Sequence, residues 1–372
     1  MKVLQISAHF NPNIGGVETH LTDLVNILTK RGWRVFVLTY KPLTTKVSSR
    51  IYENQQLLKI FRIPWFAGLF YKLIKYPLLE FFYLLPGLFL TTPFVLFFVN
   101  PQIIHAHGLV AGFTAVFWGK IFRKKIIISL HSIYNFPRVG VYRSFVTLVF
   151  KNADYVLGLS KQSTEEIRSL GIKEIKVKKF TYWIDLKKFK KVDNAKFQLD
   201  WEEKFTCLFV GRLVYEKGVV ELLRSVKDWD QNICLKIIGS GPLEKKVEDA
   251  VLNLPNLNFI KGIDSDNLPI YYSGSDLLIV PSVSEEGFGR VILESLACGT
   301  PVIGARKGAI PEALEESVGK IIDISPEKIK QAVEYFYRSR SELKELARKC
   351  RGFAERRYSE KNAEKIIKAY RE

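Results

Sequence analysis

The sequence predicts an α/β fold of two Rossmann-like domains, each with a parallel sheet covered by helices on both faces. Apolar runs of strand length alternate with stretches of helical periodicity, which is the βαβ rhythm of such sheets. This rhythm starts again near the middle of the chain. A length of 372 residues also suits two domains that each bury a core of their own.

The first half opens with an apolar run at residues 3–7 and a helical pattern at residues 17–31, whose leucine and valine side chains share one stripe. A glycine at position 32 lies where that helix is expected to end. Further strands are predicted at residues 34–39, 103–107, 126–131 and 155–160.

The second half repeats the pattern after a polar, basic and irregular segment at residues 185–203, which we interpret as the interdomain linker. Strands are predicted at residues 206–211, 234–239, 258–260, 277–281 and 301–304. Helices are predicted near residues 217–228, 242–253, 266–274, 289–298, 326–350 and 359–371. The expected domains are residues 1–184 and 185–354, with the C-terminal helix at residues 355–372 packing back on the first domain.

The net charge of +18 is unevenly distributed. Residues 1–190 hold 27 Lys and Arg against 9 Asp and Glu, whereas residues 191–372 hold 29 of each. The basic half is expected to attract an anionic partner such as a lipid surface, a nucleic acid or an acidic small molecule. Four scattered cysteines without a CxxC pair fit a reducing compartment, and the chain start shows no signal peptide pattern.

Residues 57–99 are unusually apolar, and residues 81–99 carry no charge, which is near the length of a membrane span. Pro86, Gly87 and Pro93 are expected to interrupt the run, and it lies between strands of one sheet. A true span is therefore disfavoured, and two readings stay open: a buried pair of core helices and a partly membrane-inserted surface. Cations at positions 59, 62, 72 and 75, beside aromatic residues, fit a surface near anionic lipid.

The most informative segment is residues 284–304, where Glu286 and Glu294 stand eight positions apart. A Gly-Phe-Gly turn and an apolar helix start lie between them. Glycine allows a close backbone approach, and the start of a helix favours an anion. Eight residues span a little over two helical turns, so both carboxylates are expected on one side. The pattern suits a phosphate at the helix start and hydroxyl groups at the acids, as in a sugar nucleotide.

Three segments in order resemble a known family: residues 9–18 (HFNPNIGGVE), residues 211–218 (GRLVYEKG) and the E-x7-E segment from residue 286. They are similar to retaining nucleotide-sugar glycosyltransferases of the family that includes phosphatidylinositol mannosyltransferases, sucrose synthases and bacterial glycogen synthases. The resemblance covers nearly the whole chain. It implies the GT-B fold, two Rossmann-like domains facing each other across a cleft, and hexose transfer from a UDP- or GDP-sugar without a metal or other cofactor.

Arg212 and Lys217 follow a predicted strand and lie five positions apart, so both can reach one point. Two cations there can stabilise the charge that develops on a diphosphate leaving group. The resemblance assigns them this catalytic and donor-binding role. Gly15 and Gly16, between the first strand and helix, match the family loop whose backbone approaches the donor diphosphate.

The resemblance also assigns the remaining donor contacts. It implies that Glu286 binds hydroxyls of the hexose near the reacting carbon and that Glu294 binds the ribose. Further donor contacts, many through the backbone, are expected from Gly262, Ile263, Gly287, Phe288, Gly289, Arg290 and Val291.

His131 follows a predicted strand, at the sheet edge where α/β proteins bind ligands. It resembles the cleft histidine of the family, which contacts the hexose, and completes the expected catalytic set of His131, Glu286, Arg212 and Lys217. His105 and His107 point the same way from one strand, but a third metal ligand is not evident, so no metal site is expected.

The chain departs from the family at two places. Residues 182–185 (YWID) replace a common Asn-Gly-Val-Asp, and Gly308 is followed by alanine where the family often has a second glycine. The first departure bears on acceptor shape or domain closure, and the second makes the ligand role of that loop less secure.

Two other functions were weighed. A Rossmann dehydrogenase lacks support because no Gly-x-Gly-x-x-Gly follows the first strand. A non-catalytic membrane-surface or nucleic-acid-binding scaffold would not need the set of charged residues described above. Within the enzyme reading, the acceptor is expected to be a lipid or lipid-linked glycan rather than a soluble sugar or polysaccharide. The expected location is the cytoplasm, peripheral on the inner face of the membrane, and no nucleic-acid partner is expected.

Overall fold

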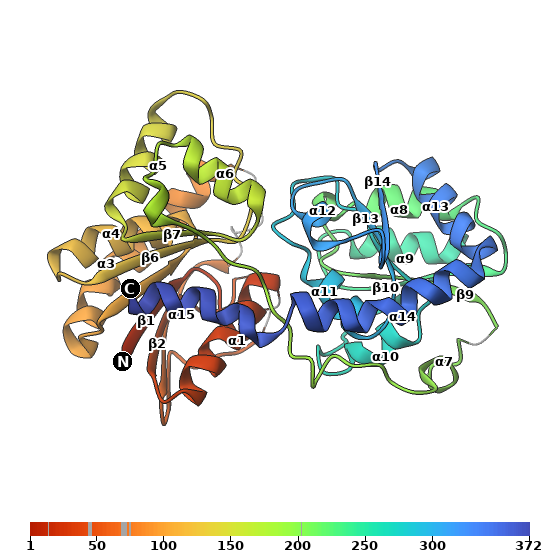
Figure 1. Ribbon diagram of the computed structural model, residues 1–372, viewed down its shortest axis with the longest axis horizontal. Helices are drawn as coiled ribbons and strands as arrows, with labels where there is room; N and C mark the ends of the chain where they lie inside the picture. Colours follow the sequence, from red (N-terminus) through yellow and green to blue (C-terminus); the bar gives the residue numbers. More distant parts are fainter. Residues whose placement is uncertain (14, 44–46, 68–72, 74–75, 202) are drawn as a thin grey trace. The chain divides into compact units, whose positions relative to one another are not determined.

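The computed structural model describes residues 1–13, 15–43, 47–67, 73, 76–201 and 203–372. The chain divides into two compact units, each with one sheet flanked by helices (Figure 1). The first unit comprises Met1–Thr181 and Asn362–Glu372, and the second comprises Tyr182–Lys361. The first residue of the second unit thus lies three positions before the predicted start of the second domain, and only the last eleven residues return to the first.

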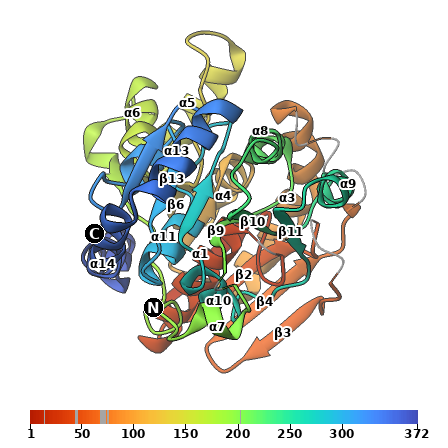
Figure 2. The same ribbon diagram turned by 90° about the vertical axis from the view of Figure 1, so that its right-hand side faces the viewer.

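The first unit contains an eight-stranded sheet with the order β3-β4-β2-β1-β5-β6-β7-β8. All neighbouring strands run parallel except β3 and β4, which form an antiparallel pair at one edge (Figure 2). The strands are β1 (Lys2–Ser7), β2 (Arg34–Tyr40), β3 (Tyr52–Gln55), β4 (Leu58–Ile63), β5 (Ile103–His107), β6 (Lys125–Leu130), β7 (Tyr155–Gly158) and β8 (Val177–Lys179). The helices are α1 (Gly16–Lys30), α3 (Pro77–Val99), α4 (Leu109–Ile121), α5 (Val141–Asn152), α6 (Lys161–Ser169) and α15 (Ala363–Arg371), with the 3-10 helix η2 (Glu174–Lys176).

The two faces of this sheet differ in character because alternate residues of a strand point to opposite sides. Leu4 and Ile6 of β1 belong to a large apolar core that includes residues of α3, α4 and α5. Between them, Gln5 points to the other face, where it pairs in register with His105 and contacts Tyr370 of α15. The polar residues of the central strands therefore gather under the C-terminal helix.

The predicted pair of core helices within residues 57–99 is wrong: the segment holds the strand β4 and one long helix, α3. Pro93 does not end this helix, although it leaves the carbonyl of Phe89 without its backbone donor. Trp118 Nε1 of α4 donates a hydrogen bond to that carbonyl at 2.8 Å. A side chain from the neighbouring helix thus replaces the missing N–H.

A second side chain enters α3 next to Pro86. The hydroxyl of Tyr40, at the end of β2, donates to the carbonyl of Leu84 and accepts from the N–H of Leu88 at 3.0 Å. Gly87 leaves the room for this ring, since a Cβ there would lie 2.6 Å from it. The prediction that Pro86, Gly87 and Pro93 interrupt the apolar run is therefore wrong.

One predicted lipid-facing cation is also corrected. Arg62 is buried in β4, paired with Glu53 and donating to the carbonyls of Asn11 at 2.8 Å and Arg50 at 3.2 Å. It therefore serves the sheet edge rather than a surface. The cations at positions 72 and 75 lie outside the described residues.

The second unit contains a six-stranded parallel sheet with the order β11-β10-β9-β12-β13-β14. Its strands are β9 (Phe205–Val210), β10 (Ile233–Ile238), β11 (Leu257–Ile260), β12 (Leu277–Val280), β13 (Val302–Ala305) and β14 (Gly319–Ile322). Its helices are α7 (Ala195–Gln198), α8 (Val219–Val226), α9 (Glu244–Asn253), α10 (Leu268–Ser273), α11 (Arg290–Ala297), α12 (Ile310–Ala313), α13 (Pro326–Arg338) and α14 (Arg340–Arg357), with the 3-10 helix η3 (Tyr215–Lys217). The single helix predicted at residues 326–350 is two helices, α13 and α14, which meet at Ser339.

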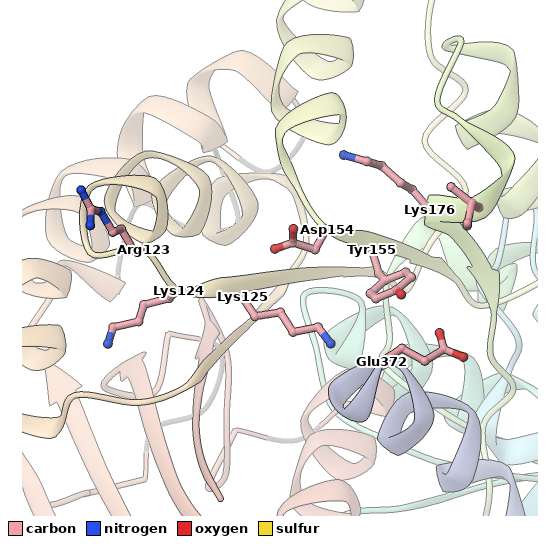
Figure 3. Close-up of a pocket in the computed structure, with 8 residues that line it drawn as sticks. Arg123, Lys124, Lys125, Asp154, Tyr155, Lys176 and Glu372 are labelled. Atoms are coloured by element: carbon pink, nitrogen blue, oxygen red, sulfur yellow. The ribbon is translucent and has the colours of Figure 1, made fainter.

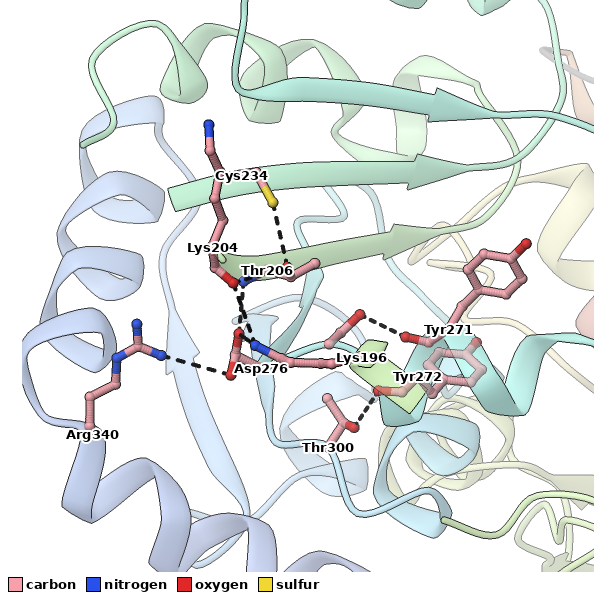
Figure 4. Close-up of polar contacts among 10 residues, drawn as sticks. Lys196, Lys204, Thr206, Cys234, Tyr271, Tyr272, Asp276, Thr300 and Arg340 are labelled. Carbon is pink, nitrogen blue, oxygen red and sulfur yellow. Dashed lines mark hydrogen bonds and ion pairs between the residues drawn. The ribbon is translucent and has the colours of Figure 1, made fainter. Parts of the chain in front are cut away.

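Polar contacts tie the amino ends of β9 and β12 together (Figure 4). Asp276, just before β12, accepts from the backbone N–H of Thr206 at 2.8 Å and from Lys196 Nζ of α7 at 2.6 Å. Arg340 of α14 lies 3.7 Å from the same carboxylate and stacks on the ring of Phe205. This edge of the sheet is structural, which leaves the carboxyl edge for ligands.

Candidate functional site

Glu286 lies in the loop between β12 and α11, at the carboxyl edge of the second sheet. Its carboxylate is paired with the ammonium group of Lys217 and accepts a hydrogen bond from Ser282 Oγ at 2.7 Å. The structure thus brings together two of the predicted catalytic residues. Ser282, two positions after β12, was not predicted, although its place just beyond a buried strand was an available signal.

The charge state of Glu286 follows from competing effects on its pKa. Burial raises the pKa, but the charge of Lys217, the hydrogen bonds from Lys217 and Ser282, and the charge of Arg212 together outweigh burial. The pKa of Glu286 is therefore held below its usual range, and the side chain is a carboxylate at neutral pH. Arg212 itself is exposed at the end of β9 and acts on this carboxylate through its charge.

Lys217 is held in place by a close contact between two loops. It ends η3, and the following Gly218 has a φ of +70°, with a Cβ there only 1.8 Å from the carbonyl oxygen of Pro281. The N–H of Val283 also donates to the carbonyl of Glu216 at 3.0 Å. Only glycine permits this approach, which brings the loop after β9 against the loop after β12.

Gly308 performs a similar role for the backbone of Glu286. It has a φ of +55°, and a Cβ there would lie 2.3 Å from the carbonyl oxygen of Glu286 and 2.4 Å from its nitrogen. The next residue, Ala309, donates its N–H to that carbonyl at 2.9 Å. The first glycine of the family motif is thus structurally required, and the second position contributes its backbone N–H whether or not it is glycine.

Glu294 is buried inside α11 and held from two sides. Tyr272 of α10 donates its hydroxyl proton to Glu294 Oε2 at 2.8 Å, and Arg290 Nε lies 3.3 Å from Oε1. Thr300 fixes this tyrosine by donating to its backbone carbonyl at 2.6 Å (Figure 4). Burial raises the pKa of Glu294, and the charge of Arg290 and the bond from Tyr272 only partly oppose this effect.

The prediction that Glu286 and Glu294 lie on one side of a single helix is wrong. The helix begins at Arg290, after Gly289 with a φ of +66°, so Glu286 belongs to the loop and only Glu294 to the helix. The eight-residue spacing therefore combines a turn with one helical turn. The guanidinium of Arg290 points inward and donates to the carbonyl of Trp183 at 3.4 Å, which leaves its backbone as the part able to meet a phosphate.

The other predicted donor contacts are placed as follows. Gly287 and Val291 are half-buried and flank the start of α11, whereas Phe288 is buried against the rings of Tyr182 and Tyr358. Gly262 and Ile263 follow β11, two strands away from β9, at the same carboxyl edge.

In the first unit, Gly15 and Gly16 lie at the start of α1, directly after the loop from β1. Gly15 has an extended backbone and packs closely against the carboxylate of Glu18. His131 follows β6, also at a carboxyl edge, and contacts His107 of β5 through a hydrogen bond of 2.9 Å between Nε2 and Nδ1.

The buried histidines of this unit are neutral. Burial lowers the pKa of His131 to about 3, and it lowers the pKa values of His105 and His107 well below the usual range. Gln5, Ser129 and Tyr370 join these histidines and were not predicted. The first two are polar residues within apolar strands, which was a usable signal, whereas Tyr370 lies 365 positions from its partner Gln5.

A separate pocket of about 540 Å³ lies at the amino ends of β6 and β7, the opposite edge from His131 (Figure 3). It is lined by Arg123, Lys124, Lys125, Asp154, Tyr155, Ile175, Lys176 and Glu372. Lys125 Nζ donates to the carbonyl of Tyr370 at 3.2 Å, and Lys176 Nζ donates to two carbonyls at the end of α5. These cations stabilise chain ends, and the pocket contains none of the predicted site residues. Among the residues that the structure describes, no group of His, Cys, Asp and Glu could hold a metal ion.

Comparison with known proteins agrees with this geometry. Residues 191–357 match the family described as Glycosyl transferases group 1, and residues 14–188 match Glycosyltransferase Family 4. The catalogued phosphatidylinositol N-acetylglucosaminyltransferase chain of Arabidopsis thaliana is 25% identical over 351 residues, which cover 90% of this chain and 74% of that protein.

Solved structures agree on the fold. Sucrose-phosphate synthase from Thermosynechococcus elongatus superposes with a TM-score of 0.83 at 22% identity, covering 100% of this chain and 98% of that one. HepE of Anabaena, in complex with UDP-glucose, superposes with a TM-score of 0.79 at 18% identity, covering 100% and 99%.

The two parallel sheets and these matches define a GT-B glycosyltransferase, as the sequence predicted. The chain belongs to the glycosyl transferases group 1 family, and its activity is that of a nucleotide-sugar glycosyltransferase.

Proposed function

We propose that the protein transfers a hexose, with retention of configuration and without a metal ion, from a nucleoside diphosphate sugar to a hydroxyl of a lipid-linked or membrane-associated acceptor. One observation supports the donor side most strongly: Lys217 is paired with Glu286, and the charge of Arg212 also acts on that carboxylate. An ionised acid and two cations at one point suit a sugar on the acid side and a diphosphate on the cationic side.

In this proposal each residue of the second unit has its own task. Lys217 and Arg212 stabilise the charge that develops on the diphosphate as the bond to the anomeric carbon breaks. Glu286 accepts hydrogen bonds from hexose hydroxyls, and Glu294 accepts them from the ribose. The first turn of α11 offers backbone N–H groups to a phosphate, helped by the dipole of the helix.

Retention is proposed to occur by displacement on one face of the sugar. The acceptor oxygen bonds to the anomeric carbon on the side from which the leaving phosphate departs, and the acceptor proton passes to a phosphate oxygen. This route requires no covalent carboxylate intermediate, so Glu286 stabilises rather than attacks. His131 is proposed to contact the hexose, as the resemblance to the family implies, and Gly15 and Gly16 the diphosphate.

The acceptor side of the proposal rests on an exposed apolar surface of the first unit. Leu90, Phe94, Phe97 and Phe98 lie on the outer side of α3, between 65% and 81% exposed, and Phe117 and Ile121 continue this surface on α4. We call these six residues the α3–α4 surface. Such a patch on a soluble domain marks an interaction site.

Two further features favour a membrane as the partner of the α3–α4 surface. The exposed Lys120 and Lys124 lie at its α4 end, and Lys124 donates to Asn100, the residue that ends α3. Cations beside inserted aromatic rings suit anionic lipid. By length and composition α3 could also cross a membrane, yet 39% of its most apolar window is buried in the unit, so we propose that it lies at the interface.

A soluble sugar or polysaccharide acceptor is the alternative within the same activity. It is compatible with the fold shared with sucrose-phosphate synthase, but it gives no reason for the exposed rings of α3. We also propose a cytoplasmic location on the inner face of the membrane, since all four cysteines are buried free thiols.

The donor proposal is tested with a panel of UDP- and GDP-sugars, by following hydrolysis of each donor. Lys217→Ala is expected to lower kcat for the preferred donor about 100-fold or more, because it removes a cation at the developing charge. Lys349→Ala is the control, since Lys349 pairs with Glu345 on the surface of α14. Unchanged turnover by Lys217→Ala would contradict the role of this lysine.

The membrane proposal is tested by co-sedimentation with vesicles of phosphatidylglycerol and, separately, phosphatidylcholine. Binding to the anionic vesicles at low salt is expected, weakening as salt screens the cations. Replacing both Phe97 and Phe98 by serine should reduce the bound fraction, whereas Leu252→Ser, at an equally exposed position of α9, should not. Absence of binding at low salt would defeat this part of the proposal.

A further inference from the structure

A chain of buried hydrogen bonds connects His131 to the C-terminal helix. It lies on the sheet face under α15 and consists of Ser129, His105, Tyr370, Gln5, His107 and His131. Each of these side chains is buried. Five hydrogen bonds between 2.6 and 3.0 Å join the chain in this order, with Gln5 in its centre.

The amide of Gln5 assigns the proton positions toward His131. Its carbonyl oxygen, Oε1, lies 2.8 Å from Nε2 of His107, and a carbonyl can only accept, so His107 carries its proton on Nε2. The neutral ring of His107 then has a lone pair on Nδ1. This atom lies 2.9 Å from Nε2 of His131, which must therefore be the donor.

The other side of Gln5 is consistent with the same assignment. Its Nε2 donates to the hydroxyl of Tyr370 at 3.0 Å, which leaves the tyrosine proton for Nδ1 of His105 at 2.6 Å. His105 then carries its proton on Nε2 and donates to Ser129 Oγ at 2.6 Å. Every bond in the chain thus has one proton, and reversing the amide would reverse the tautomer of each histidine.

We propose that Gln5, anchored by Tyr370, fixes the tautomer of His131 through His107, with the proton on Nε2 and the lone pair on Nδ1. Gln5, His107 and Tyr370 are positioning residues in this scheme, and it rests on the proposed function in giving His131 a role in transfer. In this tautomer Nδ1 can accept a hydrogen bond from a sugar hydroxyl. In the opposite tautomer Nδ1 can only donate.

The burial of the network explains why one tautomer can persist. Since burial keeps all three histidines neutral, proton addition does not erase the difference between the two ring nitrogens. A buried ring nitrogen that loses its partner also cannot turn to bulk solvent for a replacement. The last residues of the chain therefore help to set the hydrogen-bonding character of a histidine that follows β6.

The proposal is tested on the ligand-free protein by long-range proton–nitrogen NMR of uniformly ¹⁵N-labelled histidines, with His131 assigned from a His131→Gln sample. The expected spectrum of the native protein shows His131 protonated on Nε2. Protonation on Nδ1 would overturn the proposal. Because no donor is present, this result is independent of whether the proposed sugar transfer is correct.

Two variants then test the cause. Gln5→Met leaves Nε2–H of His107 without its acceptor, so the Nδ1-protonated form of His131 is expected to become populated. Tyr370→Phe removes the anchor of the amide and is expected to act in the same direction. Tyr40→Phe is the control, because it removes a buried tyrosine hydroxyl of the same unit outside the network. An unchanged His131 tautomer in both folded variants would overturn the proposal.

The kinetic consequence separates positioning from simple support of the fold. For a donor turned over by the native protein, Gln5→Met is expected to lower kcat about tenfold with little change in KM for the donor. Lost kcat in Tyr40→Phe of equal size would instead assign the effect to general loosening of the first unit.

Discussion

At the residue scale, Glu286 is the most heavily constrained of the predicted residues. Its side chain contacts Lys217 and Ser282, and its backbone is enclosed by Gly308 and Ala309. The sequence predicted the glutamate and the lysine through their motifs, but it did not predict their pairing. That contact depends on two glycine approaches between loops that are far apart in the chain.

Gly308→Ala is expected to lower transfer activity at least tenfold, because the new Cβ must displace the backbone of Glu286. Gly299→Ala is the matched control, since Gly299 also has a positive φ, +87°, but its nearest neighbour is 3.9 Å away. Both variants share a strain of about 1 kcal/mol from the left-handed backbone. Activity and thermal unfolding measured together distinguish them, and equal activity loss in both would refute the close-approach argument.

At the element scale, local sequence predicted the long parallel strands well but failed for α3 and the short strands. The strands β3, β8 and β14 were missed, since they are three or four residues long and lie at sheet edges or near them. The continuity of α3 could not be predicted, because Trp118 and Tyr40 replace its backbone bonds from other elements. Tertiary partners override the local effect of proline there.

Trp118→Phe is expected to destabilise the first unit by about 1–3 kcal/mol, because it leaves the carbonyl of Phe89 without its donor. Pro93→Ala restores a backbone N–H to that carbonyl. In the Pro93→Ala background, Trp118→Phe should therefore cost clearly less. Urea denaturation of the four proteins measures this difference, and an equal cost in both backgrounds would contradict the proposed replacement.

At the scale of the whole molecule, the two units differ as the charge division suggested. The donor residues identified by the resemblance lie mostly in the electrically neutral half, and the basic half contains the exposed α3–α4 surface and the buried histidines. The sequence predicted this division of the chain. It could not predict the histidine network, which depends on a tyrosine at the opposite end of the chain.

The stability of the first unit should depend on pH through its buried histidines and Glu80. The folded pKa of His131 is lowered to about 3 by burial, so the stability it contributes is present above an unfolded pKa near 6.5 and is lost as pH falls toward 3. Burial raises the pKa of Glu80 to about 7, so its contribution is present below about 4.5 and is lost as pH rises through 7. The two effects oppose each other between about pH 4.5 and 6.5.

Glu80→Gln should therefore make the loss of stability on acidification from pH 6.5 to 5 steeper than in the native protein. Each histidine that takes up a proton only on unfolding contributes up to about 1.4 kcal/mol per pH unit. Urea midpoints across this range provide the measurement. A shallower slope in the variant than in the native protein would show that the balance has been assigned the wrong sign.

The central claim, that Glu294 binds the nucleotide and Glu286 binds the transferred sugar, is tested most directly by calorimetric titration with UDP and GDP, which lack the sugar. For the nucleotide that binds the native protein, Glu294→Gln is expected to weaken binding about tenfold or more, whereas Glu286→Gln should leave it nearly unchanged. Weaker binding in Glu286→Gln together with native affinity in Glu294→Gln would contradict this division of roles.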